Sequence, residues 1–126
     1  MSAQNTEKTI LIYGLSGIQL MTLAMAAKKV GIRVKAVSDN QTGLTISQLL
    51  SYEELPTPEQ IQLSGKYALL DGFNGHIDEA TLLINQAASG VVKAVHTKNN
   101  SNWRFADLCF SIQQEQDVIN KLKRKK

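Results

Sequence analysis

The feature that most constrains the fold of this chain is an internal repeat. Residues 11–17 (LIYGLSG) recur as residues 69–75 (LLDGFNG), and residues 34–37 (VKAV) recur as residues 92–95, both at an offset of 58 residues. Because two separated matches share one offset, we interpret them as two copies of one supersecondary unit that pack together.

The repeat sets the expected domain organisation. A chain of 126 residues with 43% hydrophobic residues is long enough for one core. We therefore expect a single domain, residues 1–126, built from repeats at about 8–54 and 66–115. Residues 55–65 contain both prolines and join the copies, and residues 121–126 form a basic C-terminal tail.

Each copy is predicted to contain a strand, a helix, a second strand and a second helix. Apolar runs at residues 9–13 and 67–71 predict the first strands, and residues 32–37 and 91–95 predict the second strands. Capping-box spacings start the helices of the first copy, with Ser16 and Gln19 for the first and Thr45 and Gln48 for the second. Asn102 is expected to cap the last helix.

The expected architecture is an α/β fold from a duplicated βαβα unit. The first strands meet in the centre of a four-stranded, mainly parallel sheet of order 2-1-3-4, with helices on both faces and a pseudo-two-fold axis along the strands. The alternative is a ferredoxin-like α+β fold with antiparallel strands and one open face. We favour the parallel sheet because residues 10–12 and 68–70 are apolar throughout, as in strands covered on both faces.

Two glycine loops follow the central strands, and in the parallel sheet they would emerge side by side at a topological switch point, where open α/β sheets bind ligands. The helix N-termini beyond them could receive an anion. Neither loop matches a dinucleotide-binding or P-loop motif, and the alternative is that the glycines only form tight turns with positive φ. The candidate ligand-binding residues are Gly14, Ser16, Gly17, Gly72, Asn74 and Gly75.

The sequence provides no catalytic motif and no metal site. His76 and His96 are expected near the same edge, with Asp39, Asp71 and Asp78 not far away, but their spacing does not fit a zinc site. The only cysteine, Cys109, lies in an apolar helical stretch and is expected to be buried and unreactive. We predict no catalytic residues, no metal and no cofactor.

The most distinctive segment is residues 93–103. His96, Thr97 and Asn100 complete the candidate ligand-binding set. Thr97 and Asn100 can build the turn through local hydrogen bonds, and Trp103 is expected to be buried against the sheet, so that Trp103→Ala would cost about 3–5 kcal/mol. In the functional alternative, Lys93, Thr97, Asn100 and Trp103 line a pocket.

The same segment carries a resemblance to a known family. Lys93, Ala94, Val95, Thr97, Asn100 and Trp103 resemble, in type and spacing, the uncharacterised bacterial domain-of-unknown-function family 3783. The likeness covers residues 67–115, while His96 and Lys98 stand where an aliphatic residue and a proline are expected. The resemblance implies a small cytosolic bacterial protein and supplies no activity.

Charge and cysteine content bound the partners. Of 14 basic residues, five lie in the last six positions, so the rest of the chain has nine basic and 11 acidic residues and a net charge of −2. A basic face for a nucleic acid is therefore not predicted. A lone cysteine and the absence of a long apolar run favour a cytoplasmic protein without a membrane partner.

These observations favour a non-enzymatic binding or regulatory module whose partner is unidentified; a second copy and a small anionic ligand are the partners considered. One alternative is a small-molecule enzyme that holds an anionic substrate on the glycine loops and uses His76 or His96 for proton transfer. A third is nucleic-acid binding through the basic tail, which we favour least.

Overall fold

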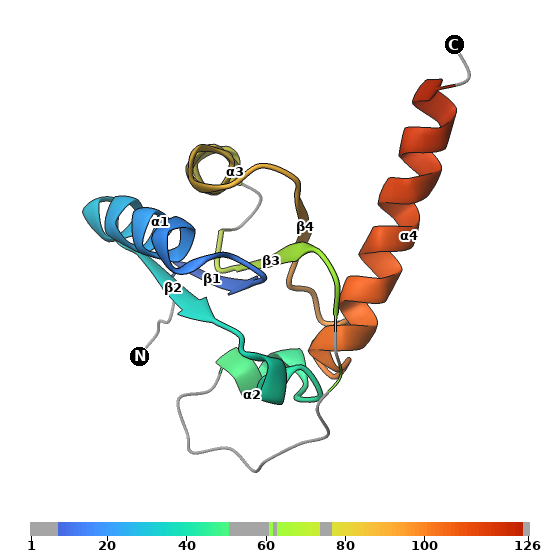
Figure 1. Cartoon of the computed structure of the whole chain (residues 1–126). Coiled ribbons are helices and arrows are strands. Elements are labelled where there is room, and N and C mark those ends of the chain that lie inside the picture. The colour runs from blue at the N-terminus through green and yellow to red at the C-terminus, as the bar shows by residue number, and fades with distance from the viewer. Residues whose placement is uncertain (1–7, 51–60, 62, 74–76, 125–126) are drawn as a thin grey trace.

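A computed structural model describes residues 8–50, 61, 63–73 and 77–124 (Figure 1). Asn74, Gly75, His76, most of the predicted linker and the last two residues of the tail lie outside these ranges. The elements in chain order are β1 (Lys8–Tyr13), α1 (Gly17–Lys29), β2 (Ile32–Ala36), the 3-10 helix η1 (Asp39–Gln41), α2 (Ile46–Leu50), β3 (Lys66–Asp71), α3 (Asp78–Ala87), β4 (Val91–Val95) and α4 (Phe105–Arg124).

The sheet has the predicted order β2-β1-β3-β4, but it is mixed and not mainly parallel. β1 is parallel to β2 and β3 to β4, whereas the central strands β1 and β3 are antiparallel, with Thr9 opposite Asp71 and Tyr13 opposite Tyr67. β3 starts at the end of the sheet where β2 finishes, and runs back.

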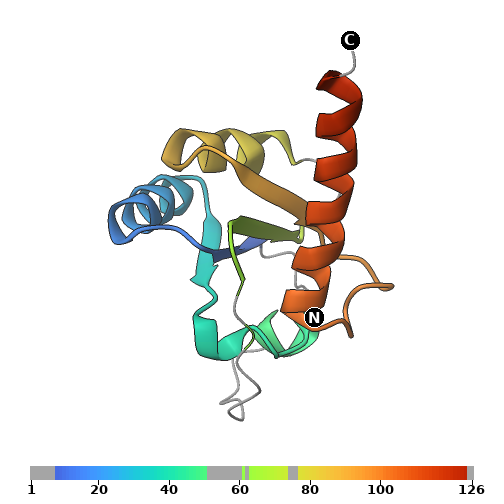
Figure 2. The same ribbon diagram turned by 45° about the vertical axis from the view of Figure 1, so that its right-hand side comes forward.

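Helices cover both faces of the sheet, as predicted, which excludes the ferredoxin-like alternative with its open face. α1 and α3 pack together on one face, and α2 and α4 lie on the other (Figures 1 and 2). Alternating residues of the central strands supply two cores: Ile10, Ile12, Ala68 and Leu70 face α1 and α3, while Leu11, Tyr13, Tyr67 and Leu69 face α2 and α4.

The internal symmetry suggested by the repeat has a different geometry from the one expected. Each half follows the order strand, helix, strand, helix. With β1 and β3 antiparallel, and α1 and α3 on one face, a two-fold axis relating the halves would run perpendicular to the sheet and not along the strands. The common origin of the halves stays a prediction.

The start of α1 is confirmed. The Gln19 backbone N–H donates to Ser16 Oγ at 3.2 Å, and the Ser16 N–H donates to Gln19 Oε1 at 3.0 Å, which completes the capping box.

The first backbone N–H groups of α2 and α4 donate to carbonyl oxygens in the loop before the other helix. A helix leaves its first N–H groups without partners inside the helix, and here the loop before each helix supplies carbonyls to the other. The four hydrogen bonds run from Ile46 N to Trp103 O (2.9 Å), Ser47 N to Ser101 O (2.9 Å), Phe105 N to Leu44 O (2.8 Å) and Ala106 N to Thr42 O (3.0 Å).

This exchange overturns two predictions. α4 begins at Phe105, so Asn102 is not its cap. Trp103 is 43% exposed and not buried against the sheet, because its backbone lies in the loop that bridges to α2.

We predict that Gly14→Ala lowers the free energy of unfolding by about 3 kcal/mol, through backbone strain and overpacking. Gly14 has φ of 93°, and a Cβ there would lie 2.3 Å from the carbonyl oxygen of Gly65. Gly17→Ala is the matched control, since a Cβ at Gly17 meets nothing within 4 Å and Ala favours a helix. Urea unfolding measures both variants; equal stabilities would show that β1 and β3 do not approach this closely.

Candidate functional site

The two glycine loops do not form one site. Since β1 and β3 are antiparallel, Gly14 and Gly17 follow β1 at one end of the sheet, and Gly72 follows β3 at the opposite end. Gly14 and Gly72 have φ of 93° and 83° and act as turn formers. Ser16 is engaged in the cap of α1. The predicted single switch point is therefore wrong, and Asn74 and Gly75 lie outside the described residues.

The observed topology produces one crevice at each end of the sheet. After β1 the chain turns to α1 on one face, and after β2 it turns to α2 on the other; β3 and β4 diverge in the same way toward α3 and α4. Diverging connections at the carboxyl ends of neighbouring parallel strands favour a binding crevice. We name these the first crevice, at β1 and β2, and the second crevice, at β3 and β4.

The first crevice holds a hollow of about 530 Å³. The Tyr13 hydroxyl donates to Asp39 Oδ1 at its edge and lies 3.4 Å from the carbonyl oxygen of Leu63. Tyr13 is only 7% exposed, and its ring packs against Phe105 with centroids 6.2 Å apart. The described lining residues are Tyr13, Gly14, Leu15, Val37, Ser38, Asp39, Leu63 and Gly65.

The electrostatics of this hollow favour a hydrogen-bond donor as ligand. Burial, followed by the hydrogen bond and the charge of Asp39, raises the pKa of Tyr13, so the phenol stays protonated and donates at neutral pH. Asp39 accepts from Tyr13 through Oδ1, which leaves Oδ2 to accept from a ligand. The described lining contains a carboxylate and no basic side chain.

Thr42 holds Asp39 in place. Its side chain is fully buried, donates to the carbonyl of Ile61 at 2.6 Å and accepts from the Ile61 N–H at 2.9 Å. These bonds fix η1 against the segment that carries Leu63. Sequence reasoning missed Tyr13, Thr42 and Leu63 as site residues; the available signal was that Tyr13 occupies the position equivalent to Asp71 in the repeat.

The second crevice contains a histidine–aspartate pair. His96 Nδ1 lies 2.7 Å from Asp71 Oδ1, and the His96 backbone N–H donates to Leu70 O at 2.9 Å. His96 Nε2 is buried and has no hydrogen-bond partner among the described residues. His96 and Asp71 lie at one edge as expected, whereas Asp39 lies at the opposite end of the sheet. His76 is outside the described residues.

Thr97 and Asn100 build the turn after β4, which confirms the structural expectation. The Thr97 N–H donates to Asn100 Oδ1 at 2.9 Å, the Asn100 N–H to Thr97 Oγ1 at 3.2 Å, and Asn100 Nδ2 to Val95 O at 3.0 Å. Lys93 shares its face of β4 with Val91, to whose carbonyl it donates. Because successive side chains of a strand point to opposite faces, His96 lies on the other face from Lys93, and Lys93 does not contribute to the second crevice.

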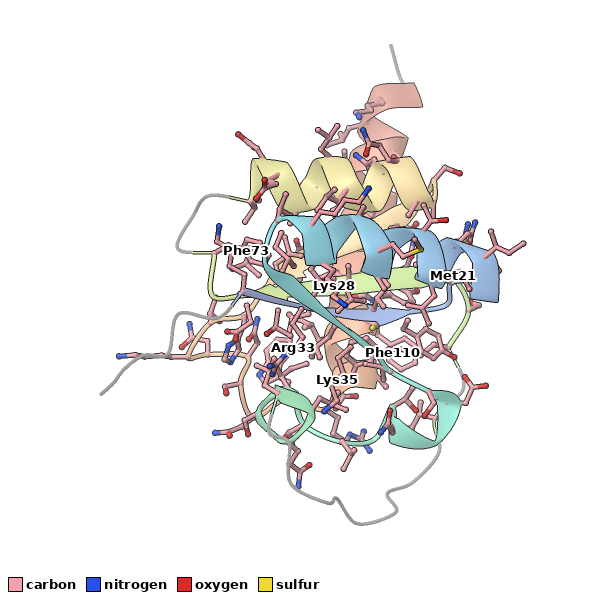
Figure 3. All side chains as sticks on the ribbon, turned by 90° about the vertical axis from the view of Figure 1, so that its left-hand side faces the viewer. Met21, Lys28, Arg33, Lys35, Phe73 and Phe110 are labelled. Carbon is pink, nitrogen blue, oxygen red and sulfur yellow. The ribbon has the colours of Figure 1, made fainter. Side chains whose placement is uncertain are left out.

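A separate hollow, of about 380 Å³, lies between the end of α1 and the edge strand β2. Lys28 and Arg33 are among its lining residues (Figure 3). This positively charged lining contrasts with the carboxylate of the first crevice.

Three further features were compared with the described part of the chain: the cysteine, groups of metal ligands and membrane-spanning helices. Cys109 is buried as predicted, and burial raises the pKa of its thiol well above the usual range, which makes it a poor nucleophile. Residues 8–50, 61, 63–73 and 77–124 contain no cluster of three or more His, Cys, Asp or Glu side chains that could hold one metal ion. No helix in these ranges has the length and apolar character needed to cross a membrane.

No family model, curated protein or solved structure matches this chain. The resemblance of residues 67–115 to family 3783 stays a prediction, and function is argued from geometry.

We predict that Tyr13→Phe makes stability less sensitive to alkaline pH. The folded-state pKa of Tyr13 is raised above its ordinary 10.0, so its stabilising contribution is complete below pH 10.0 and is lost as the pH rises through the folded pKa. Urea unfolding between about pH 8 and about pH 11 measures the slope. Tyr67 and Cys109, whose pKa values burial also raises, leave the variant a residual slope. Equal slopes would show that Tyr13 is not buried against Asp39.

We predict that Trp103→Ala costs less stability than Phe105→Ala. Phe105 is 1% exposed, and its loss should cost about 3–5 kcal/mol. Trp103 is 43% exposed, so its loss should cost less than about 2 kcal/mol. Guanidinium unfolding of both variants gives the comparison, and the reverse ranking would place Trp103 in the core.

Proposed function

We propose that the protein is a non-enzymatic binding module that takes a small ligand with an amine or hydroxyl group in the first crevice. The observation that carries this proposal is the Asp39 carboxylate, held by the buried Tyr13 hydroxyl at the edge of the hollow. A volume of about 530 Å³ lies within the range of small-molecule sites.

The pre-formed partners of Asp39 support this assignment. Thr42 and Tyr13 both join η1 to buried structure, so the Asp39 carboxylate is already positioned before a ligand binds. The Asp39 side chain therefore loses less conformational entropy on binding. The chemistry of the lining changes the expected ligand class from an anion to a donor, because an anion would face Asp39 without a basic side chain among the described lining residues.

A thermal-shift screen with matched primary amines, polyols, carboxylates and inorganic phosphate tests the proposal. Ligands that bind only the folded protein raise the melting temperature. We expect amines or polyols to stabilise the wild type and Asp107→Asn, and Asp39→Asn to lose this effect. Asp107 is a suitable control because it is also an exposed aspartate, paired with Arg104 at 2.9 Å on α4.

Three outcomes would contradict the proposal: no stabilisation by any amine or polyol, stabilisation that survives Asp39→Asn, or stabilisation by carboxylates alone. Stabilisation by phosphate that is lost in Lys28→Ala would instead place an anion site in the hollow between α1 and β2.

The Asp71–His96 pair favours a small-molecule enzyme as a second candidate. If His96 donates through Nδ1 to Asp71, its buried Nε2, which has no hydrogen-bond partner among the described residues, carries the lone pair of a base. Chemical conversion of a stabilising ligand, followed by proton NMR, would favour this candidate over a binding module.

A further inference from the structure

The hollow between α1 and β2 lies in the most basic part of the chain before the C-terminal tail. Residues 9–38 contain four basic residues and no acidic residue, whereas the rest of the chain before the tail contains five basic and 11 acidic residues. The four are Lys28 and Lys29 in the last turn of α1 and Arg33 and Lys35 in β2. Cations concentrated at one edge of the sheet attract anions to that edge.

Lys28 and Arg33 reach this hollow from opposite faces of the sheet. Ile32 and Val34 pack in the core beneath α1 and α3, so the side chain of Arg33 between them points to the other face. Lys28 belongs to α1, which covers the face that Ile32 and Val34 share. Figure 3 looks onto this edge of the sheet, where Lys28 and Arg33 lie beside β2. An anion in the hollow would therefore lie between two cations.

Both cations have N–H donors for an anion. Lys28 has no hydrogen-bond or ion-pair partner among the described residues. Arg33 takes part in another interaction, but a guanidinium has five N–H donors, so an anion can bind it alongside an existing contact. The guanidinium also matches the geometry of carboxylate and phosphate groups, which it binds through two parallel hydrogen bonds.

The carbonyl groups at the end of α1 oppose an anion only weakly. A helix C-terminus carries partial negative charge on its last carbonyls. Here the Val30 N–H donates to Ala27 O at 3.1 Å and the Gly31 N–H donates to Lys28 O at 3.3 Å, so these carbonyls already have donors. The basic residues of the last turn offset the remaining charge. Arg33 lies outside the helix, so balancing the helix dipole does not account for this second cation.

The other lining residues make the rest of the hollow apolar. They are Ala24, Gly31, Ile32 and Val34. Gly31 has no side chain, and a Cβ there would meet nothing within 4 Å, so the space beside it is open. The volume of about 380 Å³ falls within the range of small-molecule sites and is larger than an inorganic anion requires.

We propose that this hollow binds an organic anion, a carboxylate or a phosphate ester with an apolar body. The anionic group lies between Lys28 and Arg33, and the apolar body lies against Ala24 and Val34. This site goes beyond the amine or hydroxyl ligand of the first crevice, which lies at the other end of β2.

NMR titrations of the backbone amide signals with phenylacetate, phenyl phosphate, inorganic phosphate and benzylamine test the site. We expect one or both organic anions to shift the signals of residues 31–34 until they saturate, and benzylamine to leave these signals unchanged. Binding of only one organic anion identifies the head group that the site takes. Inorganic phosphate has no apolar body and should bind more weakly than phenyl phosphate by about threefold or more.

Three variants locate the anion. Lys28→Ala and Arg33→Gln should each raise the dissociation constant of the organic anion by about tenfold, as expected for the loss of one charge-assisted hydrogen bond. Lys29→Ala is the matched control, because Lys29 lies in the same last turn but does not line the hollow. It should change the dissociation constant by less than about twofold, since an exposed charge away from the ligand is screened by salt. Circular dichroism verifies that each variant is folded.

Any of three results would overturn this site. The first is the lack of a saturable shift with either organic anion. The second is equal weakening by Lys29→Ala, which would reduce the effect to general attraction by surface charge. The third is inorganic phosphate that binds as tightly as phenyl phosphate. Asp39→Asn leaves every lining residue of this hollow in place and should bind organic anions like the wild type, so failure here is distinct from failure at the first crevice.

Discussion

The antiparallel pairing of β1 with β3 determines the rest of this structure. It brings Gly14, at the end of β1, against Gly65, just before β3, where the Cβ of any other residue would collide with a carbonyl. With the central strands opposed, α1 and α3 lie on one face and α2 and α4 on the other. The two crevices therefore lie at opposite ends of the sheet, one at the carboxyl ends of β1 and β2 and the other at those of β3 and β4.

Local features of the fold were predictable because they depend on local physics. The capping-box spacing of Ser16 and Gln19 predicts the start of α1. The apolar runs predict the bounds of all four strands to within about a residue. The direction of β3 was not predictable, since a strand covered on both faces has the same apolar pattern in either direction. Asn102 was misassigned because a residue can resemble a cap while carbonyls distant in sequence accept from the helix.

The candidate sites were also predictable only where their contacts are local in sequence or follow from the pairing of neighbouring strands. The Thr97–Asn100 turn spans only four residues, and threonine and asparagine are residue types that form such turns through local hydrogen bonds. Asp71 and His96 meet because their strands are parallel neighbours, a relation that the repeat suggested. The Tyr13–Asp39 bond joins residues 26 positions apart. Thr42 reaches Ile61 across 19 positions. Tyr13 was invisible as a site residue because its ring belongs to an apolar strand and only its hydroxyl reaches the crevice.

The backbone hydrogen bonds exchanged between the starts of α2 and α4 affect how the chain folds. Their four shared hydrogen bonds join residues 42–47 to residues 101–106, so neither helix start can be completed by its own half. An isolated N-terminal half would leave the first donors of α2 in water, and an isolated C-terminal half would do the same for α4. Contacts this distant in sequence form only after a long loop has closed, which slows folding and joins the two halves into one cooperative unit. A half that existed as a separate chain would need a second copy to supply the missing carbonyls.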